Sequence, residues 1–373
     1  MSDTPTPSAR LFGLDALRGL AVLLMIEQHL GVWLWKGPAR GMSHTDYPLL
    51  AGFNALGGGA APLFVTLAGI GSSLMIAKRA RAELPVDLTL IRRGLVLIGF
   101  GLLLNLITPS WFTWRSWFVL HLMGLGMLVT PLLRRLPPRT LPLVAVAILL
   151  ATPAVQAAMH TPLDLSNLRM AGVLYEKAGV RTFVDYAPLR IALAEGQFPI
   201  FGWLSFFVAG LAAGHAIAHG QSKRVLALGA GLLALGGALA LLGALVPFDP
   251  RSVGDFATRF HVPFFPASPA LLALLAGGVL VLTGWVLRDA EAFGLHEAHP
   301  MVTLGRGSLT LLLVHVYVFR ELSRPVHMWR ALEASQALMV LGSFSLLCFV
   351  VCYLWQRVDY RFGAEWLLRK LAP

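Results

Sequence analysis

The chain has 373 residues, of which 57% are hydrophobic and only 13% are charged, and its formal net charge is +11. Soluble domains carry about one quarter charged residues, so this composition excludes a protein that meets only water. The basic residues lie in short loops between apolar runs and form no single stripe, so we expect membrane anchoring and no nucleic-acid partner.

The apolar runs are continuous, which excludes an outer-membrane barrel and predicts helices of roughly 20 residues that cross a bilayer. The predicted fold class is an all-α polytopic transmembrane bundle in a single domain, residues 1–373. The first run carries Asp15 and Arg18 and lacks a signal-peptide cleavage site, so it should remain as a helix. In chain order, about ten helices are predicted at residues 14–35, 54–77, 92–108, 115–133, 140–159, 198–218, 225–246, 268–287, 301–320 and 335–355.

Lys and Arg in the short loops predict that both chain ends are cytoplasmic, as in a bacterial inner-membrane protein. The longer connections 36–53, 160–197 and 247–267 would then lie on the exterior, where 160–197 could cap an outward-facing pocket. The basic residues that define the cytoplasmic side fall on alternate loops: Lys78, Arg79, Arg81, Arg92 and Arg93; Arg134, Arg135 and Arg139; Lys223 and Arg224; Arg357, Arg361, Arg369 and Lys370.

The first helix holds three ionisable residues on one face. At about 100° per residue, Arg18 and His29 differ by about 20° in azimuth, and Asp15 falls within about 40° of His29. The rise from Arg18 to His29 is roughly 16 Å. Ionisable groups at this depth usually face a bundle interior and are functional candidates. The alternative is an Asp15–Arg18 pair that orients the helix, and a histidine that only packs.

The pattern Asp15-x-x-Arg18-Gly19, followed by His29, resembles the opening helix of the transmembrane acyltransferase superfamily. This group includes the heparan-alpha-glucosaminide N-acetyltransferase-like proteins and the acyltransferase family 3 sugar O-acyltransferases. Segment 61–73 is similar to the Pro-x-Phe-x-Phe-x-x-Gly-x-Ser pattern of the former. The resemblance is strongest over residues 10–133, and its further matches are segments 92–94, 119–124, 198–210 and 304–315.

The resemblance implies a membrane-bound enzyme that transfers an acyl group, acetyl in particular, from cytoplasmic acetyl-CoA to a sugar or glycan beyond the membrane. His29 occupies the catalytic His position of the family 3 pattern. Heparan-type members often have Asn there, so the choice between O- and N-acylation stays open. The acceptor, the acyl chain, an acyl-enzyme intermediate and the oligomeric state stay open as well.

The chemistry fits these residues independently. A sugar hydroxyl or amine loses a proton as it attacks a thioester, and His29 could take it as general base. The phosphates of acyl-CoA need cationic partners, for which Arg18, Arg79, Arg92 and Arg93 are the candidates. The alternative for the last three is ordinary anchoring at the cytoplasmic face, while Arg18 lies deeper in its helix.

Four further polar residues could line the same pocket. Asn54 and Thr66 could instead bond across helices, and His121 and His315 could carry protons or only pack. No metal is expected, because the histidines lack a metal-site spacing. The rival function is a transporter or flippase for polar solutes or lipid-linked sugars, which buried charge and glycine-rich helices also suit. A missing internal repeat argues against it, and a scaffold without catalysis is a third reading.

Overall fold

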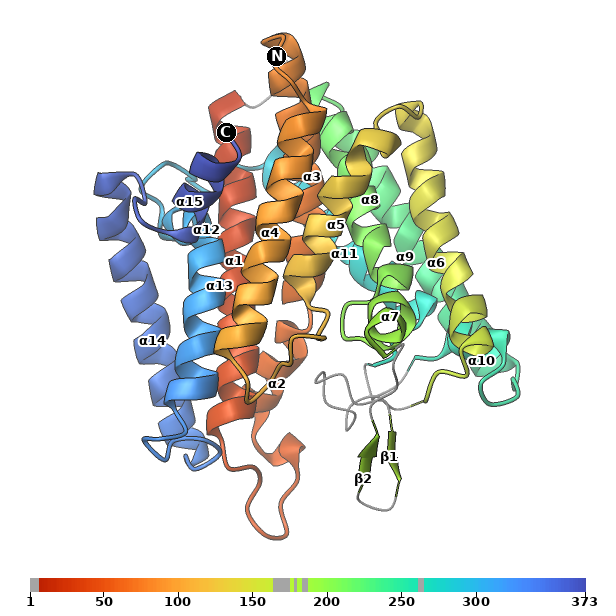
Figure 1. Ribbon diagram of the computed structural model, residues 1–373, viewed down its shortest axis with the longest axis vertical. Helices are drawn as coiled ribbons and strands as arrows, with labels where there is room; N and C mark the ends of the chain where they lie inside the picture. The colour runs from red at the N-terminus through yellow and green to blue at the C-terminus, as the bar shows by residue number, and fades with distance from the viewer. Residues whose placement is uncertain (1–6, 164–174, 178–179, 183–186, 261–264) are drawn as a thin grey trace. The chain divides into compact units, whose positions relative to one another are not determined.

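The computed structural model describes residues 7–163, 175–177, 180–182, 187–260 and 265–373 (Figure 1). It divides into two units of dense internal packing. The first unit holds Met1–Phe64 and Trp285–Leu371, with Pro373, and the second holds Val65–Gly284, with Ala372. The prediction of a single domain is not tested by this division and stays a prediction.

The first unit is built around α1, whose apolar stretch Phe12–Leu34 is long enough to cross a membrane. A helix satisfies its own backbone hydrogen bonds, which lipid cannot do, so a continuous apolar run of this length folds as a helix. A π-helical turn, Val318–Leu322, continues α13. The elements of this unit are α1 (Pro7–Leu34), α2 (Pro48–Gly57), the start of α3 (Ala60–Arg81), the end of α11 (Pro269–Arg288), α12 (Pro300–Arg306), α13 (Ser308–Tyr317), α14 (Ala334–Trp355) and α15 (Ala364–Leu371).

Helices α1 and α12 touch backbone to backbone. A Cβ added at Gly19 would lie 2.1 Å from the carbonyl oxygen of Met301, and one at Gly305 would lie 1.8 Å from that of Asp15. Small residues allow such an approach in membrane helices, where packing takes the place of the hydrophobic effect between helices. This contact fixes the height of α12 along α1.

The second unit is also helical, and its helices likewise approach one another closely at glycines. Glycines pair across α4 and α5, where a Cβ on either Gly94 or Gly124 would meet the other's carbonyl oxygen at 2.7 and 2.6 Å. A short hairpin, β1 (Tyr175–Lys177) with β2 (Val180–Thr182), pairs Tyr175 with Thr182. The helices of this unit are the rest of α3, α4 (Asp87–Ile107), α5 (Val119–Leu133), α6 (Leu141–Ala158), α7 (Ala187–Arg190), α8 (Ile200–Ala218), α9 (Ser222–Leu245), α10 (Val253–Thr258) and most of α11.

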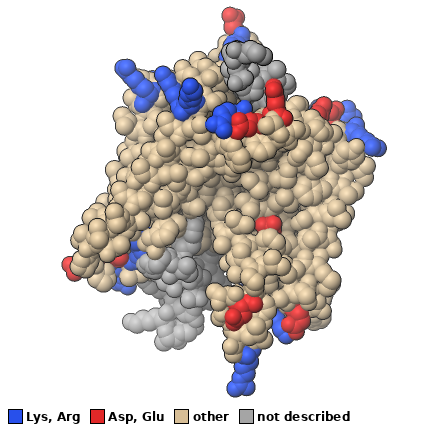
Figure 2. Space-filling model, turned by 180° about the vertical axis from the view of Figure 1, so that it is seen from behind, with Lys and Arg blue, Asp and Glu red and all other residues tan. Residues whose placement is uncertain are grey.

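The prediction of an all-α membrane protein is confirmed. In the described chain eight helices are long and apolar enough to cross a membrane, and a ninth arises if α12 and α13 form one span bent by 74°. The predicted helix 115–133 corresponds to α5, which is apolar but shorter. Eight of the ten predicted segments each correspond to one helix, while 54–77 covers the end of α2 and most of α3, and 301–320 covers α12, α13 and part of the π-helical turn. On the face drawn in Figure 2, charged side chains are few, and other residues make up most of the visible surface.

Two parts of the topology prediction stay predictions. The predicted exterior segment 160–197 lies partly outside the described residues, at 164–174, 178–179 and 183–186, so its role as a cap stays a prediction. The cytoplasmic placement of both chain ends stays one as well. Within the second unit, Arg134 Nη1 lies 2.5 Å from Asp87 Oδ1, so the two basic loops that these residues flank lie at one end.

Candidate active site

Two histidines from distant parts of the chain meet in the first unit. His29 lies in the second half of α1 and His315 lies in α13, and His29 Nδ1 is 2.8 Å from His315 Nε2. The ring planes are within 8° of parallel and the centroids are 5.1 Å apart. These values describe two rings joined edge to edge in one plane, which is the geometry of a direct hydrogen bond between ring nitrogens.

The direction of this hydrogen bond follows from the next contact. His315 Nδ1 lies 2.8 Å from the carbonyl oxygen of Leu311, which can only accept, so His315 Nδ1 is the donor there. A neutral imidazole has one donor and one acceptor nitrogen, so His315 Nε2 accepts. His29 Nδ1 therefore donates, and His29 is the tautomer with its lone pair on Nε2. His315 is fully buried and His29 is half-buried.

An indole ring and a guanidinium group pack around the histidine pair. The indole of Trp33, one turn after His29, stacks on its imidazole with centroids 4.4 Å apart and planes within 10°. The guanidinium of Arg320 lies 5.7 Å from the Trp33 ring centroid and 4.3 Å from that of Trp329. Such cation–π contacts favour Arg over aromatic faces. The pair is therefore enclosed by one indole of α1 and a cation that follows α13.

The segment after α13 is also tied to α1 through the backbone. Arg330 N donates to Trp33 O at 2.8 Å, and Leu332 N donates to Leu34 O at 2.9 Å. Lys36 and Glu333 form an ion pair beside these bonds. Two backbone hydrogen bonds and an ion pair thus join the last residues of α1 to residues 330–333.

The other end of α1 carries a charged cluster. Asp15 Oδ1 lies 2.8 Å from Arg18 Nη1, and Asp15 Oδ2 lies 3.4 Å from Arg306 Nε. Arg306 Nη1 also lies 3.0 Å from Glu297 Oε1. The predicted Asp15–Arg18 pair is present, and it is shared with a second arginine. Arg18 remains about one third exposed.

The bend between α12 and α13 is stabilised by the helix that follows α14. Glu365 Oε1 accepts from Leu309 N at 2.5 Å, and its Oε2 accepts from Thr310 Oγ1 at 2.6 Å. A carboxylate at a helix N-terminus satisfies N–H groups that have no partner in the helix. Tyr360 Oη donates to Thr303 O, and burial raises the pKa of this phenol. These contacts hold α13 at the angle that brings His315 to His29.

Of the other predicted pocket residues, none is brought to the histidine pair within the first unit. Asn54 is exposed on α2. Thr66 and His121 lie in the second unit, where Thr66 is buried and His121 Nδ1 accepts from Phe118 N at 3.1 Å. His121 also fills the space beside Gly101, at which an added Cβ would lie 2.7 Å from its Cε1. A packing and capping role therefore suits His121, while the shared pocket stays a prediction.

The predicted donor-binding arginines other than Arg18 belong to the second unit. Arg79 Nε donates to the carbonyl oxygen of Pro85 at 2.9 Å, and Arg93 Nε donates to that of Ala372 at 3.2 Å. Arg92 is exposed on α4. Arg79 and Arg93 thus each hold a backbone carbonyl, Arg79 within its own loop and Arg93 at the end of the chain. Their role in donor binding stays a prediction.

Sequence reasoning missed three residues of the site. Trp33 stands four positions after His29 and could have been found from helical spacing. Arg306 lies inside the matched segment 304–315 but was not singled out there. Arg320 falls in the π-helical turn after α13, and no pattern in the sequence announces that turn. In the described part of the chain, no three His, Cys, Asp or Glu side chains gather in a way that could hold a metal ion.

Comparison with known proteins gives one match. A family model described as "Heparan-alpha-glucosaminide N-acetyltransferase, catalytic" matches residues 10–246, which is more than half of the chain. A comparison with curated proteins found no match. The matched region includes His29, Asp15 and Arg18, and it ends before His315, which the fold brings to His29.

Proposed function

Since the chain belongs to the heparan-alpha-glucosaminide N-acetyltransferase family, we propose that it transfers an acetyl group from cytoplasmic acetyl-CoA to a sugar or glycan across the membrane. Membership supports membrane N-acetyltransferase activity as the general class. The donor, the side from which it enters, and the acceptor are the parts that we add. His29 is the general base of this proposal, with Arg18 and Asp15 at the donor end.

The observation that carries the proposal is the hydrogen-bonded pair of His29 and His315. Leu311 O fixes the tautomer of His315, and His315 in turn fixes that of His29. A base acts well when its orientation and protonation are set before the substrate arrives. The same logic operates wherever a third group orients a catalytic histidine.

In the proposed reaction the acceptor nitrogen or oxygen attacks the thioester carbonyl of acetyl-CoA. A C–N or C–O bond forms and the C–S bond breaks, while His29 Nε2 takes the proton of the attacking amine or hydroxyl. The imidazolium is stabilised by the acceptor nitrogen of His315 and by the face of Trp33. The proton then passes to the departing sulfur, which leaves as the free thiol of CoA.

The distance between Arg18 and His29 along α1 is consistent with a donor that lies parallel to this helix. Arg18 and His29 stand about 16 Å apart along the helix axis. An extended acyl-CoA with its phosphates near Arg18 could therefore reach towards His29 with its acetyl end. Arg306 adds a second cation beside Asp15 but also pairs with Glu297, so Arg18, whose side chain is about one third exposed, is the cation of this cluster that we assign to the donor.

The test uses the purified full-length protein in detergent, with acetyl-CoA as donor and glucosamine as a simple acceptor. His29→Ala should lower the release of CoA and the formation of the acetylated sugar by about 10²–10⁴-fold. His44→Ala, at an exposed histidine of the same unit, is the matched control and should leave both rates unchanged. Mass spectrometry of the product separates N- from O-acetylation.

The result that overturns the proposal is a His29→Ala protein that is folded and turns over at the rate of the wild type. Uptake of a sugar into proteoliposomes without any dependence on CoA would instead favour the transporter. The family match does not favour that function.

A further inference from the structure

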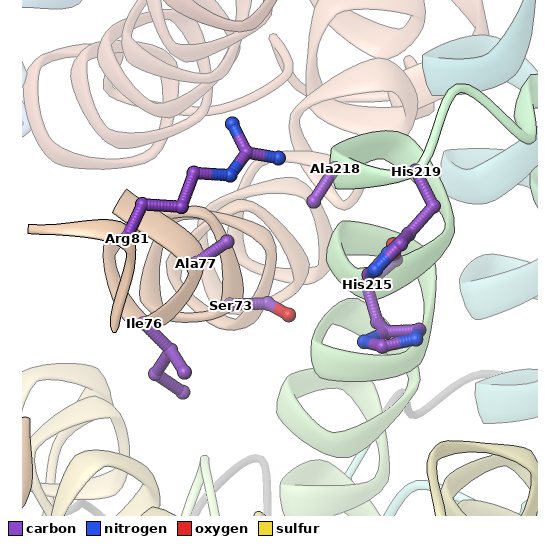
Figure 3. A pocket seen from close by; sticks show the side chains of 7 residues that line it. All are labelled: Ser73, Ile76, Ala77, Arg81, His215, Ala218 and His219. Atoms are coloured by element: carbon purple, nitrogen blue, oxygen red, sulfur yellow. The ribbon is translucent and has the colours of Figure 1, made fainter. Parts of the chain in front are cut away.

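The second unit contains a cavity between the C-terminal ends of α3 and α8 that none of the residues assigned above to the reaction lines. Its volume is about 280 Å³, large enough for a phosphate group and part of the molecule that carries it. Figure 3 shows its two walls, with Arg81 reaching from α3 and two imidazoles standing on α8. The lining residues are Ser73, Ile76, Ala77, Arg81, His215, Ala218 and His219.

None of the residues that line this cavity is acidic, and Arg81 supplies a permanent positive charge. Arg81 offers a guanidinium, and His215 and His219 stand one turn apart with ring centroids separated by 4.2 Å. His219 Nδ1 donates to His215 O at 2.8 Å, which fixes the orientation of that ring, so its Nε2 donates to a bound anion only when the imidazole is protonated. Among the ion pairs of the described residues, none involves Arg81. The cavity is therefore suited to an anion.

A buried hydroxyl adds a neutral contact point. Ser73 is only 9% exposed, and its oxygen points into the space between the two helices (Figure 3). Hydroxyl, guanidinium and imidazole groups are the side chains that bind phosphate oxygens. Ile76, Ala77 and Ala218 supply apolar surface beside them, which a bare inorganic ion would not need.

Close contacts between α3 and α8 beside the cavity fix the positions of its two walls. A Cβ at Gly210 would lie 2.2 Å from the carbonyl oxygen of Thr66, and one at Gly214 would lie 2.7 Å from that of Ile70. Because α3 and α8 touch through their backbones here, the level of Ser73 and His215 is set before any ligand binds. A preorganised site loses less entropy on binding.

We infer that this cavity is a binding site for the phosphate group of an organic ligand, held by Arg81, His215, His219 and Ser73. Two sources present this chemistry at a membrane: the nucleotide end of CoA and the headgroup of an anionic phospholipid. Naming CoA as the source rests on the proposed function, whereas the phosphate site itself does not.

The experiment measures binding of CoA, which carries no acetyl group to transfer, to the full-length protein in nanodiscs of phosphatidylcholine. Arg81→Gln and the double variant His215→Gln/His219→Gln should each weaken CoA binding by about tenfold or more, as expected for loss of a hydrogen bond to a charged group. Arg135→Gln, at an exposed arginine on another basic loop of this unit, is the matched control. Thermal melting curves verify that each variant is folded.

Nanodiscs with phosphatidylglycerol separate the two sources. If the variants bind CoA normally but lose lipid that copurifies with the wild type in native mass spectrometry, the phosphate belongs to a lipid headgroup. If folded variants retain both ligands at wild-type affinity, the inference is overturned. Acetyl transfer that is lost in His29→Ala but unchanged in a folded Arg81→Gln protein, which also binds CoA and lipid as the wild type does, would leave the proposed function intact while this site fails.

Discussion

Replacing Gly305 by Ala should destabilise the first unit. The new Cβ would lie 1.8 Å from the carbonyl oxygen of Asp15, whereas ordinary contacts begin at 3.4 Å. The backbones of α1 and α12 must therefore part by about 1.6 Å to restore van der Waals separation. Overpacking of this kind costs about 1–3 kcal/mol, and the close contact with backbone places it at the upper end of this range.

The separation would also break the longer of the two bonds of Asp15. Arg306 Nε is already 3.4 Å from Asp15 Oδ2, so a shift of α12 carries Arg306 out of range. For a unit of this size we expect the melting temperature in detergent to fall by about 5–10 °C, at about 2–4 °C per kcal/mol. Acetyl transfer should fall as well, because α13 follows α12 and carries His315.

The control is a second substitution of Gly by Ala, at a position where a Cβ has free space. Nothing lies within 4 Å of a Cβ added at Gly342, in the interior of α14. Gly342→Ala should therefore be neutral or stabilising by about 0.5–1 kcal/mol, through the higher helix propensity of Ala. The reasoning is refuted if Gly305→Ala melts within about 1 °C of the wild type, since no close α1–α12 contact could then exist.

Two further predictions concern the histidines. His315→Ala should lower acetyl transfer by about 10²-fold because His29 loses the partner that fixes its tautomer, while His315→Gln, whose amide oxygen can accept from His29 Nδ1, should recover part of the rate; equal rates in the two variants would contradict this account. His299 caps α12 by accepting from Met301 N at 3.2 Å, and burial, followed by the nearby charge of His296, lowers its pKa below the ordinary 6.5. Its folded pKa is depressed, so its contribution to stability is complete above the unfolded pKa and is lost as pH falls through the folded pKa. His299→Asn, which caps without titrating, should reduce the drop in melting temperature between about pH 7.5 and pH 5, and an unchanged drop would exclude His299 as a source of it.

Much of the site could be predicted from α1 alone. Helical periodicity placed Asp15, Arg18 and His29 on one face, and His315 was named among the residues that could line the same pocket. The structure shows the Asp15–Arg18 ion pair, which was the alternative to a role in donor binding, and it joins the two histidines directly. These successes depend on regular helix geometry, which sequence spacing encodes.

What could not be predicted depends on contacts between distant segments. The bend at Gly307 is held by Glu365, 56 positions after Leu309, and no local pattern links the two. The roles of the basic loop residues show the same limit. Positive charge indicates which side of the membrane they occupy, but not that Arg79 holds the carbonyl of Pro85 while Arg81 lines a cavity.

The contact of Glu365 with α13 also bears on the order of assembly in the cell. The first turn of α13 presents the N–H groups of Leu309 and Thr310, which have no partner within the helix until the carboxylate arrives. During synthesis, α1 and α13 can both enter the membrane before residue 365 has left the ribosome. The histidine pair would therefore be the last part of the first unit to mature. A nascent chain stalled short of Glu365 would be inserted in the membrane and still inert.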